Sequence, residues 1–510
     1  MSRIWGIFIK YLLGVSFLSR VLVVVPNYKG VSEYLYRALE HLCENLFEDI
    51  HLDVLIVDYG SDPKEMLSLK EAFKNKLSIK IIQTREDMGG AGSYWLGMLY
   101  ALQNNYDYVL LHDNDAYLAK NTLKELINTA KKFNNRAIVA PVIIIDGTNL
   151  IQECGGGFVE DGEIYPCEFG STLSNIRQKY EGSYLMNLDY TTFCVSLIPT
   201  NIIRSVGLPF KSLFIGGDDI EYGLRVKKSG FNVVCTLNAV AYHRFEVTKE
   251  ISYKRKFYTW RNVILRRLIH ESDGSYYNKA IPYWLFRRAY VNKNFRFLSS
   301  NAIEGRIVWV ALLNAINANF SKFESIKDTL LNHFKQGLNR LTIYREDTLE
   351  MSLKSFIGFL EDNYEFIICS PLLQKVFTTY GVNTLPSSLL SLNTKTVFLI
   401  LKLLFKKVIY LDNTGPFMIL PVNAIGKIKI NGSRVHVALN TVESVVRKVI
   451  LLILWILVET SSLLAYRLYM GYIWNKILKN TYKELISKYL NDTSIEQNLH
   501  TIATYIYREL

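Results

Sequence analysis

The stretch that decides the fold is YVLLHDND at residues 108–115, where an apolar run ends in two aspartates, Asp113 and Asp115. In an open α/β sheet, ligands bind beyond the carboxyl ends of the strands, so a binding site is expected here. Two carboxylates on one turn can hold a hard divalent cation, which keeps waters and substrate phosphates as further ligands. The alternative is a solvated acidic turn after a strand, and the rest of the chain has to decide between the two.

Short apolar runs of the strand type alternate with helical patterns in the first third of the chain. The strand-type runs lie at 21–25, 54–57, 79–83, 108–112 and 137–145, and the helical patterns lie at 32–46, 93–104 and 121–133. This alternation predicts a parallel sheet with right-handed crossovers. Three of the first four runs end in polar residues, namely Asn27, Asp58 and the Asp113–Asp115 pair. We therefore expect one polar rim along the sheet.

A second acidic pair lies in a more irregular stretch from residue 155 to 243. Asp218 and Asp219 follow two glycines and open a helical pattern that ends at Lys228. A strand-type run at 231–237 comes next, with His243 just beyond it. The length of this stretch and its second acidic pair predict an acceptor-binding half added to a nucleotide-binding half. Acidic residues also favour a helix N-terminus for electrostatic reasons alone, and a lone histidine is often structural.

The composition describes a folded protein in a reducing compartment. The chain has 510 residues, enough for two to four domains, and 49% of them are hydrophobic. Its six cysteines are scattered without a Cys-x-x-Cys pair, which argues against a structural zinc site and a disulfide framework.

The whole chain has a net charge of +12, and its basic residues gather in one part. Residues 244–300 contain 13 Lys/Arg and 4 Asp/Glu, a surplus of 9. Such a basic belt can face nucleic acid, an anionic membrane or an anionic substrate. An amphipathic anchor is expected near residues 4–18, without a signal peptide. The apolar runs at 389–411 and 449–466 are predicted to lie in the membrane plane or in a helical core rather than to span a bilayer.

Seven motifs occur in a fixed order: VPNY (25–28), VDYGSD (57–62), MGGAG (88–92), DND (113–115), GGDDIEYGLR (216–225), His243 and YTWRN (258–262). Together they resemble family 2 of the glycosyltransferases, which have the GT-A fold, and within it the galactofuranosyl- and rhamnosyltransferase branch. The resemblance covers residues 20–262 and implies an α/β domain with a mostly parallel, Rossmann-like sheet. The relatives that polymerise galactofuranose carry a β-sandwich before this domain, and we expect none here.

The resemblance implies roles for the acidic residues and for His243. Asp113, Asp115 and His243 would bind a divalent metal, Mn²⁺ or Mg²⁺, at the donor diphosphate. Asp219 would be the catalytic base that takes the proton of the acceptor hydroxyl. Asn114 replaces an acidic residue common in this branch, and it can still donate a hydrogen bond to the donor.

The remaining expected site residues would bind the two substrates. Pro26 and Tyr28 would frame the base, and Asp58 would accept hydrogen bonds from the pyrimidine or ribose. Glycine permits close backbone approach, which would let the donor contact the glycine-rich turn after the third strand. The acceptor would contact Asp218 and a groove shaped by Asp189, Tyr190 and the segment 258–262. The full set is Pro26, Tyr28, Asp58, Gly89, Gly90, Gly92, Asn114, Asp189, Tyr190, Asp218 and Arg261.

The sequence thus predicts an inverting, metal-dependent glycosyltransferase. It would move a sugar, galactofuranose or rhamnose, from a UDP- or dTDP-linked donor to a glycan or lipid-linked acceptor at the inner face of the cell membrane, where we expect the protein to be peripheral and cytoplasmic. The expected regions are an amphipathic segment (1–19), the GT-A domain (20–300) and a mainly helical region (301–510), with the oligomeric state open.

Two other function classes compete with this prediction. A nucleotidyltransferase would ordinarily need a basic, glycine-rich loop after the first strand, and residues 26–30 offer one lysine. A non-catalytic membrane scaffold or nucleic-acid-binding protein would use the basic belt. No nucleic-acid motif accompanies that belt, so no nucleic-acid partner is expected.

Overall fold

The computed structural model describes residues 18–158, 164–180, 184–185, 188–245, 252–270, 302–320, 322–325, 462, 464–468 and 479–510, and the backbone of six strands between 345 and 441. The expected N-terminal segment and the apolar runs at 389–411 and 449–466 lie mostly outside these residues. Among the described helices, none has the length and apolar character needed to cross a membrane.

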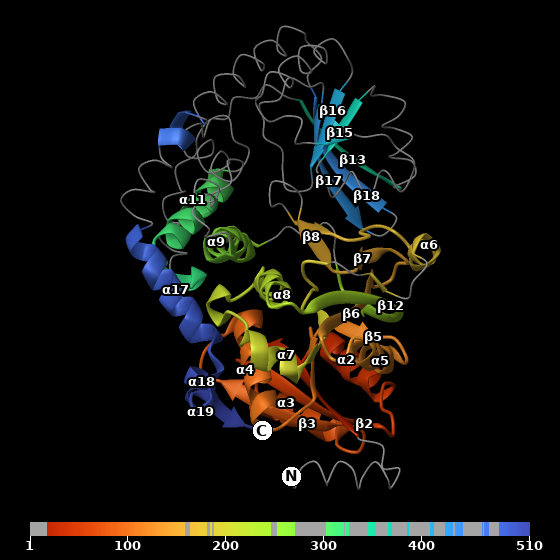
Figure 1. Cartoon of the computed structure of the whole chain (residues 1–510). Coiled ribbons are helices and arrows are strands. Elements are labelled where there is room, and N and C mark those ends of the chain that lie inside the picture. The colour runs from red at the N-terminus through yellow and green to blue at the C-terminus, as the bar shows by residue number, and fades with distance from the viewer. Residues whose placement is uncertain are drawn as a thin grey trace.

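A mixed, mostly parallel sheet forms the centre of the fold (Figure 1). Its long strands are β1 (Ser19–Tyr28), β2 (Ile50–Tyr59), β3 (Ser78–Thr84), β4 (Tyr108–His112), β6 (Ala137–Ile145), β11 (Val195–Pro199) and β12 (Asn232–His243). The order is β10-β12-β6-β11-β4-β1-β2-β3-β19, with β11 antiparallel between β4 and β6. Its short strands are β5 (Ala116–Leu118), β7 (Ile151–Glu153), β10 (Tyr184–Leu185) and β19 (Ile506–Glu509), while β8 (Gly156–Phe158) and β9 (Ile164–Pro166) pair only with each other. The predicted α/β class is confirmed.

Helices cover both faces of this sheet. Successive side chains of β1 point to opposite faces, so Val21 and Val23 pack in one apolar cluster while Leu22 and Val24 pack in the other. The first cluster includes residues of α2 (Glu33–Cys43), α3 (Pro63–Phe73) and α5 (Thr122–Lys132). The second includes residues of α4 (Gly89–Gln103), α7 (Thr200–Val206) and α8 (Asp218–Lys228). The result is a three-layer domain with its strands buried on both sides.

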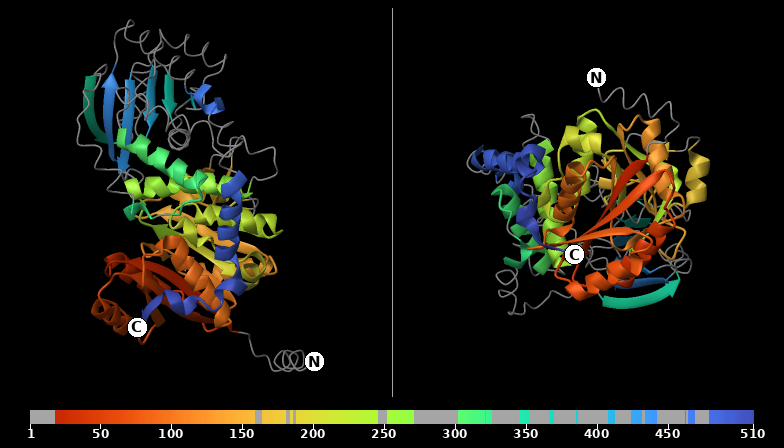
Figure 2. Two further views of the ribbon diagram at one scale, coloured as in Figure 1. Left: turned by 90° about the vertical axis from the view of Figure 1, so that its left-hand side faces the viewer. Right: turned by 90° about the horizontal axis from the view of Figure 1, so that it is seen from below.

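The last residues of the chain return to this domain. Strand β19 pairs antiparallel with β3, and α17 (Lys479–Thr493) packs against α9 (Tyr253–His270). The C-terminus accordingly lies beside the edge of the sheet in both Figures 1 and 2. Short helices lie between these elements: α6 (Leu173–Lys179), η1 (Lys211–Leu213), α18 (Ile495–Asn498) and α19 (Ile502–Tyr505). The domain boundary at residue 300 stays a prediction, but residues 479–510 belong with the first sheet.

A second sheet lies at the other end of the molecule (Figures 1 and 2). Its strands are β13 (Arg345–Ser352), β14 (Phe366–Cys369), β15 (Leu385–Pro386), β16 (Val408–Asp412), β17 (Ala424–Asn431) and β18 (Arg434–Thr441), in the order β13-β18-β17-β16-β14-β15. The C-terminal region contains helices, as predicted, among them α11 (Ala302–Ile316). The sequence analysis did not foresee this sheet.

Candidate active site

Strand pairing brings the two parts of the predicted metal site together. The turn from Asp113 to Asp115 joins β4 to β5, and β5 pairs with the end of β12 so that Ala116 lies opposite His243. As a result, His243 Nε2 lies 3.2 Å from Asp115 Oδ1. On the other side, the Asp113 amide donates to the carbonyl of Cys194, just before β11, at 2.8 Å. The turn is therefore held by one strand on each side.

The donor atoms at this turn fit a divalent cation. In the described part of the chain, one group of Asp, Glu, His and Cys side chains could hold a metal, namely Asp113, Cys194 and His243, whose ligand atoms all lie within 4.8 Å of one another. Asp115 adds a carboxylate beside His243. Carboxylates and imidazole suit Mn²⁺, and carboxylates suit Mg²⁺. Asp113, Asp115 and His243 remain predicted ligands, and motif reading did not find Cys194.

Two neighbours fix the orientation of these groups. The Tyr94 hydroxyl donates to Asp113 Oδ1 at 2.6 Å, and Gln152 Oε1 lies 2.8 Å from His243 Nδ1. If His243 Nδ1 carries the proton, Nε2 is left with its lone pair facing the turn. Burial, and then the charge of Asp115, raises the pKa of Asp113. Burial also raises the pKa of the Cys194 thiol well above its ordinary value.

Asp218 and Asp219 form the first turn of α8. Gly216 and Gly217 precede them with φ values of +82° and +83°, a region that favours glycine. Asp219 Oδ1 accepts a hydrogen bond from the amide of Ile220 at 2.8 Å. Burial raises the pKa of both carboxyl groups, and the charge of Asp219 raises that of Asp218 further. This is the environment expected of a carboxylate that takes up a proton during a reaction.

The YTWRN motif supports this loop from behind. Asn262 Nδ2 donates to the carbonyls of Ile215 and Gly216 at 3.1 and 2.7 Å. Arg261 has no exposed surface, and its Nη2 donates to the carbonyls of Ser212 and Leu213 at 2.9 and 3.1 Å. The expectation that Arg261 binds substrate is therefore wrong for this conformation, because its guanidinium is used to hold the loop.

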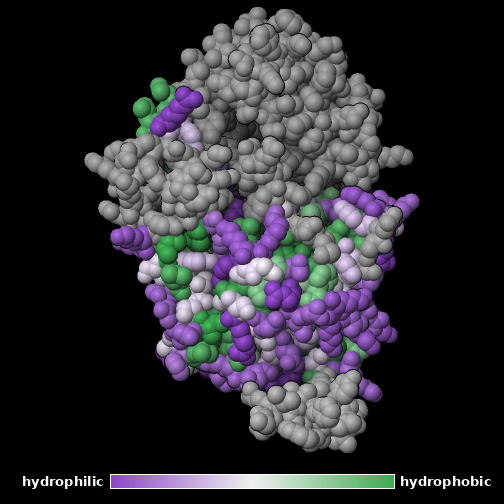
Figure 3. All heavy atoms as spheres, in the orientation of Figure 1, coloured by the Kyte–Doolittle hydropathy of each residue, from purple (hydrophilic) through white to green (hydrophobic). Residues whose placement is uncertain are grey.

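Other basic residues of the same helix are also buried. Lys256, Arg266 and Arg267 on α9 are at most 8% exposed. Much of the described part of the expected basic belt therefore packs inside the protein, while Arg244 and Arg255 stay exposed. Residues 271–300, which make up the rest of the belt, lie outside the described part of the chain. The face in Figure 3 mixes hydrophilic side chains with small apolar groups among its described residues.

Glu153 lies near Asp219, and the sequence analysis did not foresee it. Burial, and then the charge of Asp219, raises its pKa to about 7. It stands at the end of the three-residue strand β7, next to Gln152. In the sequence, Gln152 and Glu153 are two adjacent polar residues after an apolar residue, but they belong to none of the motifs.

Asp189 and Tyr190, which were expected to shape the acceptor groove, contact other parts of the protein. Asp189 forms an ion pair with Lys227 at 2.5 Å. Tyr190 is 4% exposed, and its ring packs so closely on Gly156 that a Cβ there would lie 2.4 Å away. Tyr190 therefore shapes the site through packing, and its ring is not offered to a sugar.

On the donor side, Tyr28 is exposed but Asp58 is not. Tyr28 is 50% exposed at the end of β1, next to Pro26 in the same strand, and its ring lies 6.1 Å from that of Tyr59. Asp58 is fully buried and accepts hydrogen bonds from Asn27, Ser61 and Gln83 at 2.5–2.8 Å.

Asp58 consequently acts on the site through Asn27. Asn114 Nδ2 donates to Asn27 Oδ1 at 3.1 Å, which joins the network of Asp58 to the acidic turn. The prediction that Asp58 itself contacts the nucleotide does not hold in this conformation.

The glycine-rich turn contacts the loop before α8. Gly89 has φ +63°, and a Cβ there would lie 2.1 Å from the carbonyl oxygen of Phe214. That oxygen also accepts the amide of Ala91 at 3.1 Å. Gly90 has open space where its Cβ would be, whereas a Cβ on Gly92 would lie 2.7 Å from Met88. Gly90 is thus the glycine free to meet a donor, while Gly89 serves the contact with the loop.

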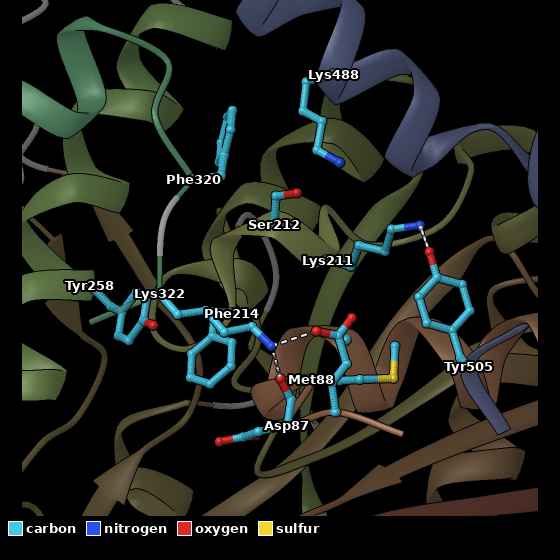
Figure 4. A pocket seen from close by; sticks show the side chains of 12 residues that line it. Asp87, Met88, Lys211, Ser212, Phe214, Tyr258, Phe320, Lys322, Lys488 and Tyr505 are labelled. Carbon is cyan, nitrogen blue, oxygen red and sulfur yellow. Dashed lines mark hydrogen bonds and ion pairs between the residues drawn. The ribbon is translucent and has the colours of Figure 1, made fainter. Parts of the chain in front are cut away.

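A cavity of about 190 Å³ lies beside this contact (Figure 4). Phe214, Tyr258, Phe320 and Tyr505 form its aromatic part, and three lysines line it. Each lysine has an acidic neighbour: Lys322 lies 2.7 Å from Glu86, while Lys488 and Lys211 lie 3.2 and 3.7 Å from Asp492. Its charges are therefore largely balanced.

The chain is similar to known glycosyltransferases over part of its length. Residues 22–165 match the family model described as glycosyl transferase family 2. Galactofuranosyltransferase GlfT1 of Mycobacterium tuberculosis is 30% identical over 163 residues, which is 31% of this chain and 50% of GlfT1. Poly(ribitol-phosphate) beta-N-acetylglucosaminyltransferase TarS of Staphylococcus aureus is 31% identical over 130 residues, 26% of this chain and 22% of TarS. The chain thus spans about half the length of GlfT1.

The similarity to solved structures is weaker. GalNAc-T7 with UDP, GalNAc and Mn²⁺ aligns with a TM-score of 0.42 at 13% identity, covering 67% of this chain and 61% of that protein. TarS 1-349 of S. aureus with UDP aligns with a TM-score of 0.37 at 14% identity, covering 61% and 86%. The family model matches residues 22–165, so this part of the chain is a glycosyl transferase family 2 domain.

Proposed function

We propose that this chain is an inverting, metal-dependent glycosyltransferase that uses a UDP- or dTDP-linked sugar. The acceptor would be a glycan or a lipid-linked glycan, and galactofuranose and rhamnose are the proposed sugars. The observation that supports this most is the meeting of Asp113, Asp115 and His243 at one edge of the sheet, with the buried carboxylate of Asp219 close enough for its pKa to be raised by Asp113. The naming of GlfT1 as a galactofuranosyltransferase supports the choice of sugar.

Different residues would act on the leaving group and on the acceptor. Asp113, Asp115 and His243 would hold Mn²⁺ or Mg²⁺, which stabilises the negative charge of the departing nucleoside diphosphate. Asp219 would accept the proton of the acceptor hydroxyl at its carboxylate while that oxygen attacks the sugar carbon from the face opposite the diphosphate. One such displacement inverts the configuration of that carbon. Asp218 would orient the acceptor beside the base.

A panel of nucleotide sugars tests this proposal. The full chain would be incubated with UDP- and dTDP-linked sugars, Mn²⁺ and lipid-linked or soluble glycan acceptors, and the released nucleotide would be measured. We expect release of a nucleoside diphosphate from at least one donor, and loss of this release in the presence of a chelator. Release of pyrophosphate would favour a nucleotidyltransferase, and a panel in which no donor reacts would contradict the proposal.

We further propose that the protein works as a peripheral protein at a membrane surface, because a lipid-linked acceptor would be presented there. Sedimentation with vesicles that contain anionic lipid, at low and high salt, measures this directly. Salt-sensitive binding is the expected result. Equal recovery in the supernatant with and without vesicles would contradict it.

A further inference from the structure

Cys194 lies opposite the acidic turn, close enough to contact a metal bound there. The residue immediately precedes β11, whose first residue pairs with His112 across from β4. Its carbonyl accepts the amide of Asp113 at 2.8 Å, and its own amide donates to Thr192 Oγ1 at 3.2 Å. Both contacts fix the backbone of Cys194 opposite Asp113. The side chain is 4% exposed.

The sulfur lies within reach of two predicted metal ligands. Cys194 Sγ, a carboxylate oxygen of Asp113 and a ring nitrogen of His243 all lie within 4.8 Å of one another. Donors at about 2.0–2.3 Å from one zinc ion are about 3.3–3.7 Å apart in a tetrahedron. Each pair would therefore have to close by no more than about 1.5 Å, which side-chain rotation can supply.

We propose that Cys194 is a further protein ligand of this centre and makes it prefer thiophilic divalent cations over Mg²⁺. This inference rests on the metal role proposed above for Asp113 and His243. A thiolate is a soft donor that favours Zn²⁺, Co²⁺ and Cd²⁺, whereas an all-oxygen site suits Mg²⁺. On binding, the metal replaces the thiol proton, which passes to the solvent.

The alternative is a buried cysteine that only packs, and Cys194 does belong to an apolar cluster with Val195 and Leu197. If Cys194 only packs, replacing its sulfur should not change which metal the site prefers. A substitution by serine separates the two explanations, since it keeps the size of the side chain and removes the soft donor.

Absorption spectroscopy with Co²⁺ tests the inference on the full chain. Metal-free protein would be titrated with Co²⁺, with and without UDP, since a diphosphate can complete the coordination shell. We expect a near-ultraviolet thiolate-to-cobalt charge-transfer band that saturates with one ion per chain. The band should be lost in Cys194→Ser, weakened in Asp115→Ala and unchanged in Cys43→Ser, whose cysteine lies on α2 and is not among the grouped ligand atoms.

Competition by other cations gives a second readout. Cd²⁺ should bind Cys194→Ser more weakly than the unchanged protein, by at least the roughly 10–100-fold that loss of an outer ligand partner costs. The affinity for Mg²⁺ should stay the same in both proteins. If Co²⁺ binds and needs Asp115 but gives no thiolate band, the role of Cys194 is wrong and the proposed function stands. If no ion binds with or without UDP, the metal role itself is wrong and this inference falls with it.

If Cys194→Ser does not fold, the spectrum of the unchanged protein still decides. A band that persists in Cys43→Ser and weakens in Asp115→Ala supports the inference. A band lost in Cys43→Ser places the thiolate elsewhere and overturns it.

Discussion

Sequence motifs identified several residues of the candidate site, but only the structure shows which of these residues are buried. Asp113 and Asp115 were predicted because acidic residues follow a strand, and Asp219 was predicted from the resemblance to glycosyltransferases. Asp113 lies close enough to both Asp115 and Asp219 for their charges to act on one another. Asp58 and Arg261 were predicted to bind substrate, but both are completely buried. A motif identifies the residue type that a site requires. It does not tell a residue that touches the ligand from one that supports it.

The pH dependence of transfer follows from the burial of Asp219. Burial raises its pKa above the ordinary value of 3.8, so the carboxyl group stays protonated to higher pH than an exposed aspartate would. A base must be deprotonated to act, and kcat/KM should therefore fall on the acid side at a pH above 3.8. Nucleotide binding measured over the same range separates this effect from loss of the metal. A rate that is constant down to the ordinary aspartate value would contradict the assignment.

Gln152 should control the affinity of the site for metal. Its Oε1 lies 2.8 Å from His243 Nδ1, and partners of this kind orient a ligating histidine. Gln152→Leu should weaken Mn²⁺ binding roughly 10–100-fold, as measured by calorimetry. Gln152→Glu keeps an acceptor for Nδ1–H and should restore most of the affinity. Equal dissociation constants for the leucine variant and the unchanged protein would show that Gln152 has no such role.

At the scale of the elements, the loop before α8 is held from two sides. Asn262 and Arg261 on α9 bind its carbonyls, and the start of α4 contacts it through Gly89. The position of Asp219 therefore depends on two other helices, α4 and α9, that are far apart in sequence.

Gly89→Ala should destabilise the protein and Gly90→Ala should not. Gly89 has φ +63° and no room for a Cβ, so alanine should cost about 1–3 kcal/mol of unfolding free energy. Gly90 has open space and lies in a helix, where alanine is favoured by about 0.5–1 kcal/mol. Urea unfolding of both variants measures the difference. Gly90→Ala should instead raise KM for the donor if the diphosphate approaches there. Equal stabilities of the two variants would contradict the close contact with Phe214.

The long strands were predictable and the short ones were not. The apolar runs at β1, β4 and β6 stand out because parallel strands are buried on both faces, and β6 has the predicted bounds of 137 and 145. Strands β5, β7 and β19 have three or four residues, too few for a periodic signal. In the second sheet, Lys427 and Lys429 alternate with isoleucines in β17, and this period of two was the available signal for a strand.

At the scale of the whole molecule, the C-terminal segment packs against the elements of the first sheet's domain. Glu221 on α8 is completely buried and bonds Arg225 at 2.8 Å, His270 on α9 at 3.0 Å and the Tyr489 hydroxyl on α17 at 3.0 Å. Asp492 on the same helix accepts the amide of Ser212 at 3.2 Å. The sequence could not predict the contacts of Tyr489 and Asp492, because these two join residues more than 260 positions apart.

Tyr489→Phe tests this arrangement with the loss of a single oxygen. Hydrogen bonds to charged groups contribute about 1.5–3 kcal/mol, so the variant should lose about that much unfolding free energy. Tyr507→Phe is a matched control, because that tyrosine is 61% exposed and its variant should unfold like the unchanged protein. If Tyr489→Phe also unfolds at the same urea concentration, α17 does not support the domain in solution.

The central claim is that the acidic turn holds the leaving group while Asp219 activates the acceptor. The most direct measurement compares UDP binding and sugar transfer in Asp115→Ala and Asp219→Asn, each with and without Mn²⁺. We predict that Asp115→Ala loses both transfer and the Mn²⁺ dependence of UDP binding. We predict that Asp219→Asn keeps Mn²⁺-dependent UDP binding while transfer falls by about 10²–10⁴-fold. The claim would be contradicted if Asp219→Asn transferred sugar as fast as the unchanged protein, or if UDP binding to Asp115→Ala still depended on Mn²⁺.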